Sequence, residues 1–433
     1  MKFYLHSIGC RLNQSEMETL GRQLLAAGHE VVTDSAESEV AVLNTCAVTA
    51  EASRDSLQHT RRIHHQNSAT RIVVTGCDAT LHPTPLLRQP GVTHVAANRD
   101  KDQLIHILDP QVSVQTALFE REPLARDVSV GGLSHTRAFV KVQDGCRNRC
   151  TFCITTLARG DSVSRRSADI VAEIQQLAAV GYREAVLTGV HLGSYGQDFD
   201  RPVTLYDLVQ AILTHTDMPR LRLSSLEPWD ISPDFFCLWQ NSRLLPHLHL
   251  PLQSGCDNTL RRMARRTTRV GFRALVEAAR AAIPDLSLTT DIICGFPGET
   301  ETDFQMSLEY VASLAFSRLH VFTYSPRPGT VAATLPNQTP AAAKKERTQR
   351  MLALGQTLSL AFHRRFEGRV LPVLWESPVG ADDRGVRWAG YTDNYIRVQA
   401  YGRLDWRHQT TTMRLCRPHW TGMDGEPVGE NQT

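Results

Sequence analysis

Short apolar runs alternate with amphipathic stretches along the first 80 residues of the chain. Residues 3–8, 40–45 and 71–76 are the apolar runs, and we expect each of them to be a strand. A capping-box pattern, Ser15 followed by Glu18, predicts that the helix after the first strand begins at Ser15. Strands that alternate with helices predict a parallel sheet with right-handed crossovers.

A second series of strand and helix patterns follows. The candidate strands are 138–143, 184–188, 220–224, 247–251, 286–292 and 318–323. Six βα units in about 190 residues predict a partial or full parallel barrel, with its active site at the carboxyl ends of the strands.

The remaining segments set the expected domain boundaries. Residues 110–136 have few apolar runs and are predicted to be a linker, and 340–365 are predicted to be one long helix. Residues 367–418 contain short alternating strands and turns, which are typical of a small all-β barrel, and we expect the last dozen residues to be frayed. The predicted fold is therefore α/β: an N-terminal parallel α/β domain (1–115), a central (β/α)6 partial barrel (132–364) and a C-terminal all-β barrel (366–420).

Composition narrows the class of protein. Hydrophobic residues make up 42% of the 433 and charged residues 21%, which excludes a disordered, collagen-like or coiled-coil protein. A net charge of +2 excludes a polybasic protein but not a local basic patch. No apolar run is long enough to span a bilayer, and the N-terminus becomes polar too early for a secretory signal, so we expect a cytoplasmic protein without a membrane partner.

Three of the ten cysteines, Cys10, Cys46 and Cys77, each lie just after a predicted strand. Disulfides are not expected in a long chain without an export signal, so thiolates that bind metal are the better interpretation. The carboxyl ends of parallel strands form the ligand-binding edge of an open α/β sheet, where these three could converge. The alternative is that all three are buried core residues.

Three further cysteines form the motif Cys146-x3-Cys150-x2-Cys153 directly after the first barrel strand. Three thiolates on one loop can hold three irons of a [4Fe–4S] cluster and leave the fourth iron open for a substrate with amino and carboxylate groups. The alternative is a zinc site, but zinc usually needs a fourth ligand, and the nearest histidines, His135 and His191, lie outside the loop.

This motif, placed after the first strand of a six-unit βα barrel, resembles that of the radical S-adenosylmethionine (SAM) enzymes. The resemblance implies that Cys146, Cys150 and Cys153 hold the catalytic cluster. That cluster would donate one electron to the SAM sulfonium, giving methionine and a 5′-deoxyadenosyl radical.

The whole chain, over about residues 1–420, resembles the methylthiotransferases. The matching segments are GCRLNQSE (9–16), NTCAVT (44–49), VTGC (74–77), FVKVQDGCRNRCTFC (139–153), TGVHLGSYG (188–196), RLSSLEP (222–228), LHLPLQSG (248–255) and DIICGFPGET (291–300). The resemblance implies a second [4Fe–4S] cluster on Cys10, Cys46 and Cys77, which would take up the incoming sulfur. It also implies a TRAM-like RNA-binding barrel at the C-terminus.

Within this family the segments around Cys10 and Cys146 look most like the group that modifies N6-threonylcarbamoyladenosine at position 37 of tRNA. The resemblance implies that one SAM methylates the sulfur and a second gives the radical that removes a hydrogen from C2 of the adenine. An electron donor such as flavodoxin or ferredoxin and a sulfur donor would be further partners. After Cys153 the segment ITTLARGDSVSRRS departs from the commoner form of the family.

Other functions remain open at this stage. Within the family the substrate could be N6-isopentenyladenosine in tRNA or an aspartate of a ribosomal protein. Outside it, the chain could be a non-catalytic Fe–S or zinc protein that binds RNA.

Polar residues near the predicted strand ends are candidates for SAM binding. They are Gly189, Ser224, Glu227, His249, Gln253 and Asp291, with Ser225 and the turn 295–298 as weaker ones. The alternatives are turns and caps for the small residues, a core position for His249 and a structural hydrogen bond for Asp291.

Clustered arginines are candidates for RNA binding. They are Arg261, Arg262, Arg265, Arg266, Arg364 and Arg365, with Arg269 and Arg369 close by. A solvated helix face is the alternative. Trp388, Tyr391, Tyr395 and Arg397 could stack on bases or form the core of the small barrel, and Cys237, Cys256, Cys294 and Cys416 are predicted to be packing residues.

Overall fold

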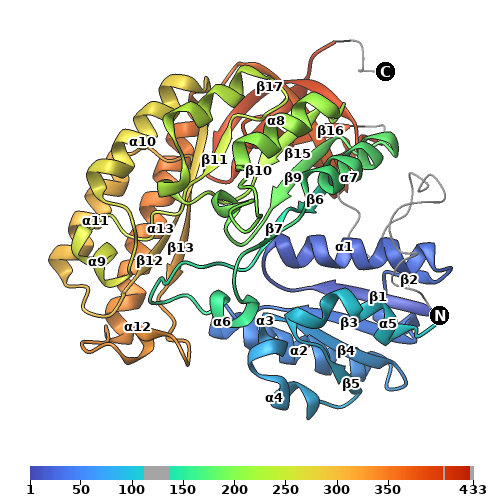
Figure 1. Ribbon diagram of the computed structural model, residues 1–433. Helices are drawn as coiled ribbons and strands as arrows, with labels where there is room; N and C mark the ends of the chain where they lie inside the picture. The colour runs from blue at the N-terminus through green and yellow to red at the C-terminus, as the bar shows by residue number, and fades with distance from the viewer. Residues whose placement is uncertain (112–135, 403–404, 430–433) are drawn as a thin grey trace.

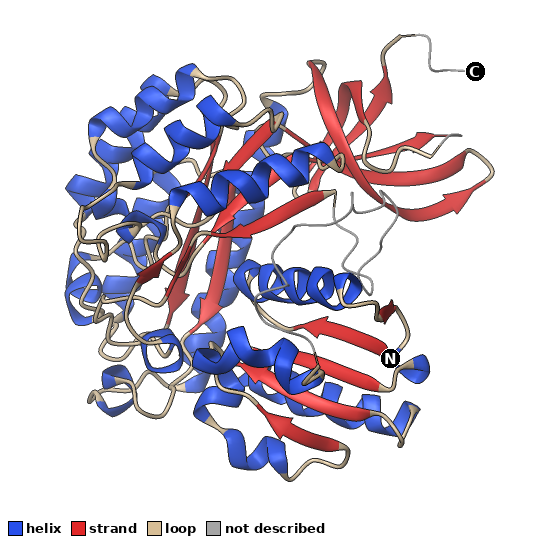
Figure 2. Ribbon diagram, turned by 45° about the vertical axis from the view of Figure 1, so that its right-hand side comes forward, coloured by secondary structure: helices blue, strands red, loops and turns tan. Residues whose placement is uncertain are grey.

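Three packed units make up the part of the chain that the computed structural model describes, residues 1–111, 136–402 and 405–429 (Figures 1 and 2). The α/β fold expected from the sequence is confirmed. Almost all of the predicted linker lies outside the described residues, so the exact domain boundaries stay predictions.

The N-terminal unit contains one five-stranded parallel sheet in the order β2-β1-β3-β4-β5. Its strands are β1 (Lys2–Ser7), β2 (Glu30–Val32), β3 (Val40–Thr45), β4 (Arg71–Gly76) and β5 (Val92–Val95). Its helices are α1 (Arg11–Ala26), α2 (Ala50–Gln66), α3 (Cys77–Leu81), α4 (Pro83–Leu87) and α5 (Leu104–Leu108), with short 3-10 turns at Ser35–Glu37 and Asn98–Gln103. The three strands predicted here are confirmed.

Helices cover both faces of this sheet, which explains why the first four residues of its central strand are all apolar. In β3, Val40 and Val42 pack with α1 and α5, whereas Ala41 packs with α2 on the other face. Alternate residues of a strand point to opposite faces, so a strand between two helical layers favours apolar residues on both faces.

Helix α1 begins at Arg11, four residues before the predicted start at Ser15, and the expected capping box is absent. The Ser15 hydroxyl instead donates to the carbonyl of Phe139 at 2.7 Å, and Glu18 Oε2 accepts from the Phe139 N–H at 3.5 Å. Phe139 lies on β6 (Arg137–Lys141), an edge strand of the central unit whose outer backbone groups need partners. The pair that resembles a cap therefore docks the N-terminal unit onto the barrel.

Burial at this junction makes Glu18 a source of pH dependence. Burial raises the pKa of Glu18 from about 4.5 to about 8, although Arg22 and the Phe139 N–H act in the opposite direction. Because the folded pKa exceeds the unfolded one, folding stability should fall by about 1.4 kcal/mol for each pH unit between these values. We expect Glu18→Gln to flatten this decline in urea unfolding midpoints between pH 5 and pH 9. Glu30→Gln, at an exposed position, should leave the slope of the wild type unchanged.

The central unit is a partial barrel of six parallel strands, as predicted. Three-stranded sheets β6-β9-β10 and β11-β12-β13 are joined by parallel bridges between Leu221 and Leu244 and between Ser225 and His249. The other strands are β9 (Glu184–Thr188), β10 (Arg220–Leu223), β11 (His247–His249), β12 (Ser287–Cys294) and β13 (Arg318–Thr323). A small hairpin is formed by β7 (Gln143–Asp144) and β8 (Val163–Ser164).

Helices wrap the outside of this partial barrel (Figure 1). They are α7 (Ser167–Ala179), α8 (Leu205–His215), α9 (Asp257–Arg262), α10 (Arg269–Ala282), α11 (Glu301–Ser313), α12 (Val331–Thr334) and α13 (Ala341–Arg364), with 3-10 turns at Leu192–Ser194, Pro228–Asp230 and Pro233–Gln240. Helix α6 (Thr155–Arg159) lies instead at the junction with the N-terminal unit, next to α3 (Figure 1). Helix α13 matches the long helix predicted for 340–365.

The C-terminal unit is a closed five-stranded barrel in the order β14-β15-β16-β18-β17. Its strands are β14 (Val370–Asp382), β15 (Gly385–Thr392), β16 (Arg397–Gly402), β17 (Thr410–His419) and β18 (Gly422–Pro427). Fraying of the last dozen residues was the wrong expectation for 422–427, because β18 pairs with both β16 and β17 and closes the barrel. Trp388 packs in its core with Trp375 and Trp406.

None of the helices in the described ranges is both long enough and apolar enough to cross a membrane.

Candidate active site

The loop from Gly145 to Ile154 connects β7 to α6 at the carboxyl ends of the barrel strands. Gly145 has φ +69°, and a Cβ there would lie 1.9 Å from the carbonyl oxygen of Asp161, so the position requires glycine. The buried Gln143 amide donates to the carbonyls of Asp144 and Gly145 and accepts from the backbone N–H of His191. These contacts fix the start of the loop.

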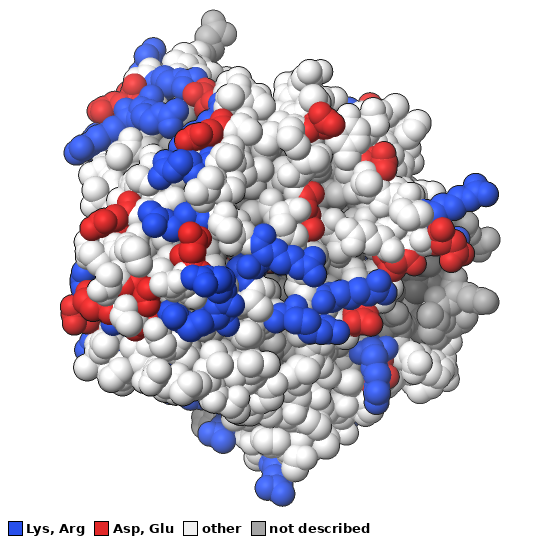
Figure 3. Space-filling view, turned by 60° about the vertical axis from the view of Figure 1, so that its left-hand side comes forward, with Lys and Arg blue, Asp and Glu red and all other residues white. Residues whose placement is uncertain are grey.

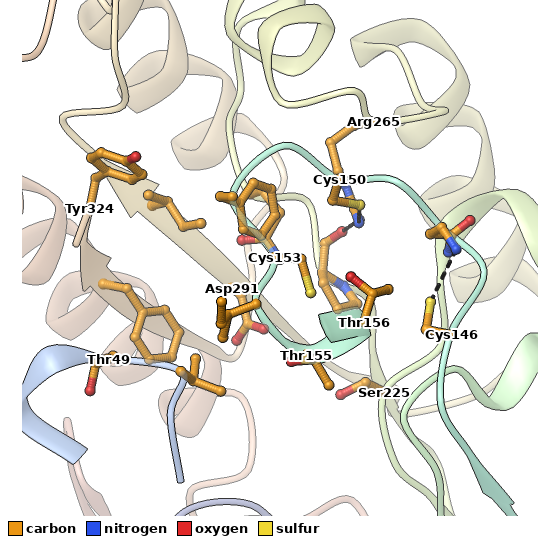
Figure 4. Close-up of a pocket in the computed structure, with 18 of the residues that line it drawn as sticks. Thr49, Cys146, Cys150, Cys153, Thr155, Thr156, Ser225, Arg265, Asp291 and Tyr324 are labelled. Carbon is orange, nitrogen blue, oxygen red and sulfur yellow. Dashed lines mark hydrogen bonds between the residues drawn. The ribbon is translucent and has the colours of Figure 1, made fainter. Parts of the chain in front are cut away.

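The barrel cysteine group (Cys146, Cys150 and Cys153) lines one cavity of about 310 Å³. Figure 4 shows the three side chains around this space, with Thr49, Asp291 and Tyr324 across from Cys146. The backbone N–H of Asn148 donates to Cys146 Sγ at 3.4 Å, and Arg265 Nη1 lies 3.9 Å from Cys150 Sγ. Such donors stabilise negative charge on a sulfur, so the site suits thiolates.

Arg265 is an internal cation of this cavity, with a side chain only 1% exposed. Its guanidinium donates to both carboxylate oxygens of Glu227, at 3.0 and 2.6 Å, and stacks 4.5 Å from the Trp229 ring centroid. The fork geometry keeps the cation in one orientation beside Cys150.

Burial shapes the protonation of the groups around the loop. It raises the pKa of the Cys150 thiol to about 11, although Arg265 acts in the opposite direction. A metal that binds this sulfur must therefore displace its proton at neutral pH. Burial alone would lower the pKa of His191, but its hydrogen bonds to Asp230 and Cys146 raise that pKa to about 10.

The N-terminal cysteine group (Cys10, Cys46 and Cys77) lies at one edge of the first sheet, because each residue follows one of the adjacent strands β1, β3 and β4. Electrostatic interaction links Cys46 to both of the others, and burial raises its pKa to about 11. The N–H of Val48 lies 3.5 Å from Cys46 Sγ, and Asn98 Nδ2 lies 3.7 Å from Cys77 Sγ. The predicted convergence of the strand ends is thus observed.

The donor sets of the two groups fit [4Fe–4S] clusters. Each consists of three soft sulfur ligands with N–H donors nearby, and each iron of a cube takes only one thiolate. Over the described residues, no three His, Cys, Asp or Glu side chains are placed to ligate a single metal ion.

Comparison with known protein families divides the chain in the same way as the fold. Residues 2–97 match the model described as "Uncharacterized protein family UPF0004", and residues 140–311 match the radical SAM superfamily.

Relatives that align along nearly the whole chain identify the family more closely. The threonylcarbamoyladenosine tRNA methylthiotransferase MtaB of Bacillus subtilis (strain 168) is 34% identical, over 98% of this chain and 95% of its own length. The protein of the same name from Thermotoga maritima is 35% identical, over 92% of this chain and 91% of its own length. The tRNA-2-methylthio-N(6)-dimethylallyladenosine synthase of B. subtilis is 32% identical, over 99% of this chain and 86% of its own length.

The chain belongs to the radical SAM methylthiotransferase family. The fold of this methylthiotransferase is also similar to that of TsrM, a radical SAM methyltransferase from Kitasatospora setae solved with cobalamin and a [4Fe–4S] cluster. The TM-score is 0.58 over 77% of each chain at 16% identity, which establishes similarity of fold alone.

The six candidates for SAM binding divide into two sets. Glu227, Gln253 and Asp291 line the cavity of the methylthiotransferase, and Gln253 has an uncommon φ of +73° for a non-glycine residue. Gly189, Ser224 and His249 are not among the residues that line it, whereas their neighbours Val190 and Ser225 are.

His249 reaches the cavity only through a partner. Its Nε2 lies 3.4 Å from Asp291 Oδ2, and its Nδ1 lies 2.8 Å from Thr289 Oγ1. The Asp291 pKa is lowered, because its hydrogen bond to His249 and the nearby positive charges outweigh the effect of burial. His249 is therefore a bonded internal histidine, as the alternative interpretation proposed.

The candidate arginines do not form a single surface. Arg261, Arg266, Arg364 and Arg365 are exposed, and Arg262 is half-buried beside Asp303. Arg265 is the exception, because it is buried against Glu227, and the expectation that it faces an external phosphate is wrong. Figure 3, with the side of α9–α11 turned forward, shows Lys and Arg side chains across the middle of this face with acidic side chains among them.

Several cavity residues were not among the candidates for SAM binding named from the sequence. Thr49 follows Cys46, and Thr155 and Thr156 follow Cys153, so proximity to a cysteine was the available signal. Phe152, Ile293 and Tyr324 form apolar walls that only the fold brings together. Of the four remaining cysteines, Cys256 and Cys294 are buried as expected and Cys416 is half-buried, but Cys237 is exposed and is not a packing residue.

Proposed function

We propose that this methylthiotransferase inserts a methylthio group at C2 of N6-threonylcarbamoyladenosine at position 37 of tRNA. The observation that supports this most is that the segment after Cys46 reaches the cavity of the barrel cysteine group. Val48 and Thr49, which follow Cys46 of the N-terminal group, line the same cavity as the barrel cysteine group.

The barrel cysteine group would hold the [4Fe–4S] cluster that binds SAM, and the N-terminal cysteine group would hold the second cluster. When bound, these clusters and SAM supply the one-electron and sulfur-transfer chemistry that amino-acid side chains lack. The electron donor and the sulfur donor are expected to be separate partners.

The residues around the cavity would orient the reactants and exclude water. Glu227 and Asp291 line the cavity and would offer carboxylates to the amino group of SAM, and Arg265 balances the charge of Glu227 next to Cys150. The rings of Phe152 and Tyr324 close one side of the space, which protects a reactive radical from solvent.

Hydroxyl groups support the threonylcarbamoyl substrate. Six serine and threonine residues line the cavity: Thr49, Thr155, Thr156, Ser225, Thr323 and Ser325. Thr323 also lines a neighbouring hollow with Lys344 and Lys345, whose charge suits a carboxylate. A threonylcarbamoyl group has a carboxylate, a hydroxyl and amide groups to match these residues, whereas an isopentenyl group offers them no polar atom.

The adenosine would have to leave the anticodon stack to reach the cavity, as is usual for enzymes that modify a base. Exposed Arg261, Arg266, Arg364 and Arg365 would contribute contacts to the RNA backbone. The C-terminal barrel would add a further RNA surface.

Nucleoside mass spectrometry of tRNA tests this function. The host would lack its own methylthiotransferases and express this chain or an empty vector. We expect threonylcarbamoyladenosine to gain the mass of SCH3 in place of H. A shift of isopentenyladenosine instead would keep the chemistry and overturn the substrate, and no shift of either nucleoside with normal SAM cleavage would point to the ribosomal-protein aspartate.

A further inference from the structure

Helix α6 connects the two cysteine groups directly. It begins two residues after Cys153, and its last residue, Arg159, points into the junction with a side chain that is 2% exposed. Its other buried residue, Ala158, packs against Ala47 and Cys77 of the N-terminal unit.

One end of the Arg159 guanidinium contacts the N-terminal group. Its Nη2 donates to Asn13 Oδ1 at 2.7 Å. The Asn13 amide in turn donates to the carbonyl of Ile8 at 2.8 Å and to that of Thr45 at 3.1 Å. These two carbonyls belong to the backbone just before Cys10 and Cys46. Arg159 therefore holds in place the Asn13 side chain that connects the Cys10 and Cys46 loops.

The other end of the guanidinium contacts the barrel group. Arg159 Nη1 donates to Asp144 Oδ1 at 2.8 Å, and the same oxygen accepts from the N–H of Gly145, also at 2.8 Å. The next residue is Cys146, whose N–H donates to the carbonyl of Gly160 at 3.0 Å. The start of the barrel loop is therefore held by the end of α6.

A buried ion network holds this guanidinium in place. Glu16 accepts from Arg159 at 2.9 Å and also pairs with Lys101 and Lys141, and Lys141 pairs with Asp144 at 2.7 Å. Buried charges of this kind keep one geometry because breaking any pair leaves a charge uncompensated. The third N-terminal cysteine is tied to α6 as well, since Asn98 Nδ2 donates to the Ala158 carbonyl at 2.8 Å and lies 3.7 Å from Cys77 Sγ.

We propose that Arg159 is a positioning residue that locks the two cysteine groups at one separation, so that sulfur transfer at one group follows radical formation at the other. It interacts electrostatically with the N-terminal cysteines but is not among the residues that line the cavity. The inference rests on the proposed function for its chemical consequence, but the mechanical link itself does not depend on any cluster.

The test compares Arg159→Lys with Arg22→Lys. Lysine keeps the charge but cannot bridge Asn13 and Asp144 with a planar fork. Arg22 is a matched control, because it also forms a buried ion pair across the same junction, with Glu173 at 3.1 Å, at a place away from the cysteine loops.

Hydrogen exchange of the cluster-free protein gives the first readout. Arg159→Lys should speed exchange by about tenfold in both 8–13 and 144–146, and Arg22→Lys in neither. Acceleration in one segment only, or in neither, would overturn the link. If Arg159→Lys is insoluble, Asp144→Ala serves as the second variant, because it removes one of the contacts of Arg159. Hydrogen exchange in 8–13 should then also become faster. Faster exchange in 144–146 alone would contradict the proposal.

The second readout uses the enzyme with its clusters. In Arg159→Lys the iron content and the rate of 5′-deoxyadenosine formation should stay within about twofold of wild type. The ratio of methylthio product to 5′-deoxyadenosine should fall by about tenfold, which is about 1.4 kcal/mol. An unchanged ratio, or loss of iron, would overturn the positioning role. If wild type itself makes no methylthio product, the proposed function fails, while hydrogen exchange still decides the mechanical link.

Discussion

Replacing Cys150 by alanine is expected to reduce SAM cleavage more than about 100-fold, because the barrel cluster would lose one of its three protein ligands. Replacing Cys46 is expected to have a different effect: 5′-deoxyadenosine should still form within about threefold of the wild-type rate, but no methylthio product should appear. The two variants would thus separate the steps that we assign to the two cysteine groups. Measuring iron, 5′-deoxyadenosine and modified nucleoside in parallel checks both expectations.

A control for these variants is available in the same chain. Cys237 is exposed and is not among the residues that line the cavity, so Cys237→Ala should keep the iron content, SAM cleavage and product of the wild type. A Cys46→Ala protein that still methylthiolates RNA would refute the two-cluster assignment. Equal loss of SAM cleavage in Cys46→Ala and Cys150→Ala would also contradict it.

The largest effect on stability is expected from Glu184→Gln, at the junction between the two barrels. Glu184 is fully buried and accepts from Arg222 at 2.7 Å and from Arg220 at 2.9 Å. These positive charges hold the Glu184 pKa well below its ordinary range, even though burial acts in the opposite direction. A neutral amide would leave Arg222, which is also fully buried, without its counter-charge, at a cost of about 3–5 kcal/mol.

Loss of the Glu184 charge should also weaken the attachment of the C-terminal barrel. Arg220 and Arg222 contact Asp393, and Arg222 lies 4.4 Å from the ring centroid of Tyr395. Unfolding midpoints and the rate of proteolysis within 370–427 would measure both effects.

An exposed pair between the same two units provides the comparison for Glu184→Gln. Asp285 and Arg369 are about 40% exposed and lie 2.6 Å apart, so Asp285→Asn should cost no more than about 1 kcal/mol. A similar loss of folding stability in Glu184→Gln and Asp285→Asn would show that burial does not control the strength of this junction.

Local patterns in the sequence were sufficient for the strands and the cysteines. Strand ends follow from apolar runs a few residues long, and Cys10, Cys46 and Cys77 could be placed at one sheet edge because parallel strands end together. The spacing within 146–153 predicted a metal-binding loop, since all three cysteines lie within eight consecutive residues. The second inference needed no contact between distant segments, and the first needed only that the three strands lie side by side in one parallel sheet.

The roles predicted for polar residues were less accurate, because the hydrogen-bond and ion-pair partners of these residues lie far away in the sequence. Ser15 and Glu18 resemble a cap, but their partner is Phe139, more than 120 residues away. Arg265 belongs to a run of arginines, yet it is neutralised by Glu227, which lies 38 residues earlier. The sequence alone does not distinguish a charged side chain that faces water from one that pairs with a buried carboxylate.

The sequence by itself therefore determined three strands of the first sheet, the six strands of the partial barrel, the three units and the six cysteines that could bind metal, because these depend on short-range patterns and on the shared end of parallel strands. It did not predict the edge strands β2 and β5 or the small hairpin of β7 and β8. The tertiary structure alone decided which polar residues line the cavity, that Arg265 is internal, and that Arg159 connects the two cysteine groups. The physical reason is that the energy of a buried charge depends on its partners, and those partners come together only when the chain is folded.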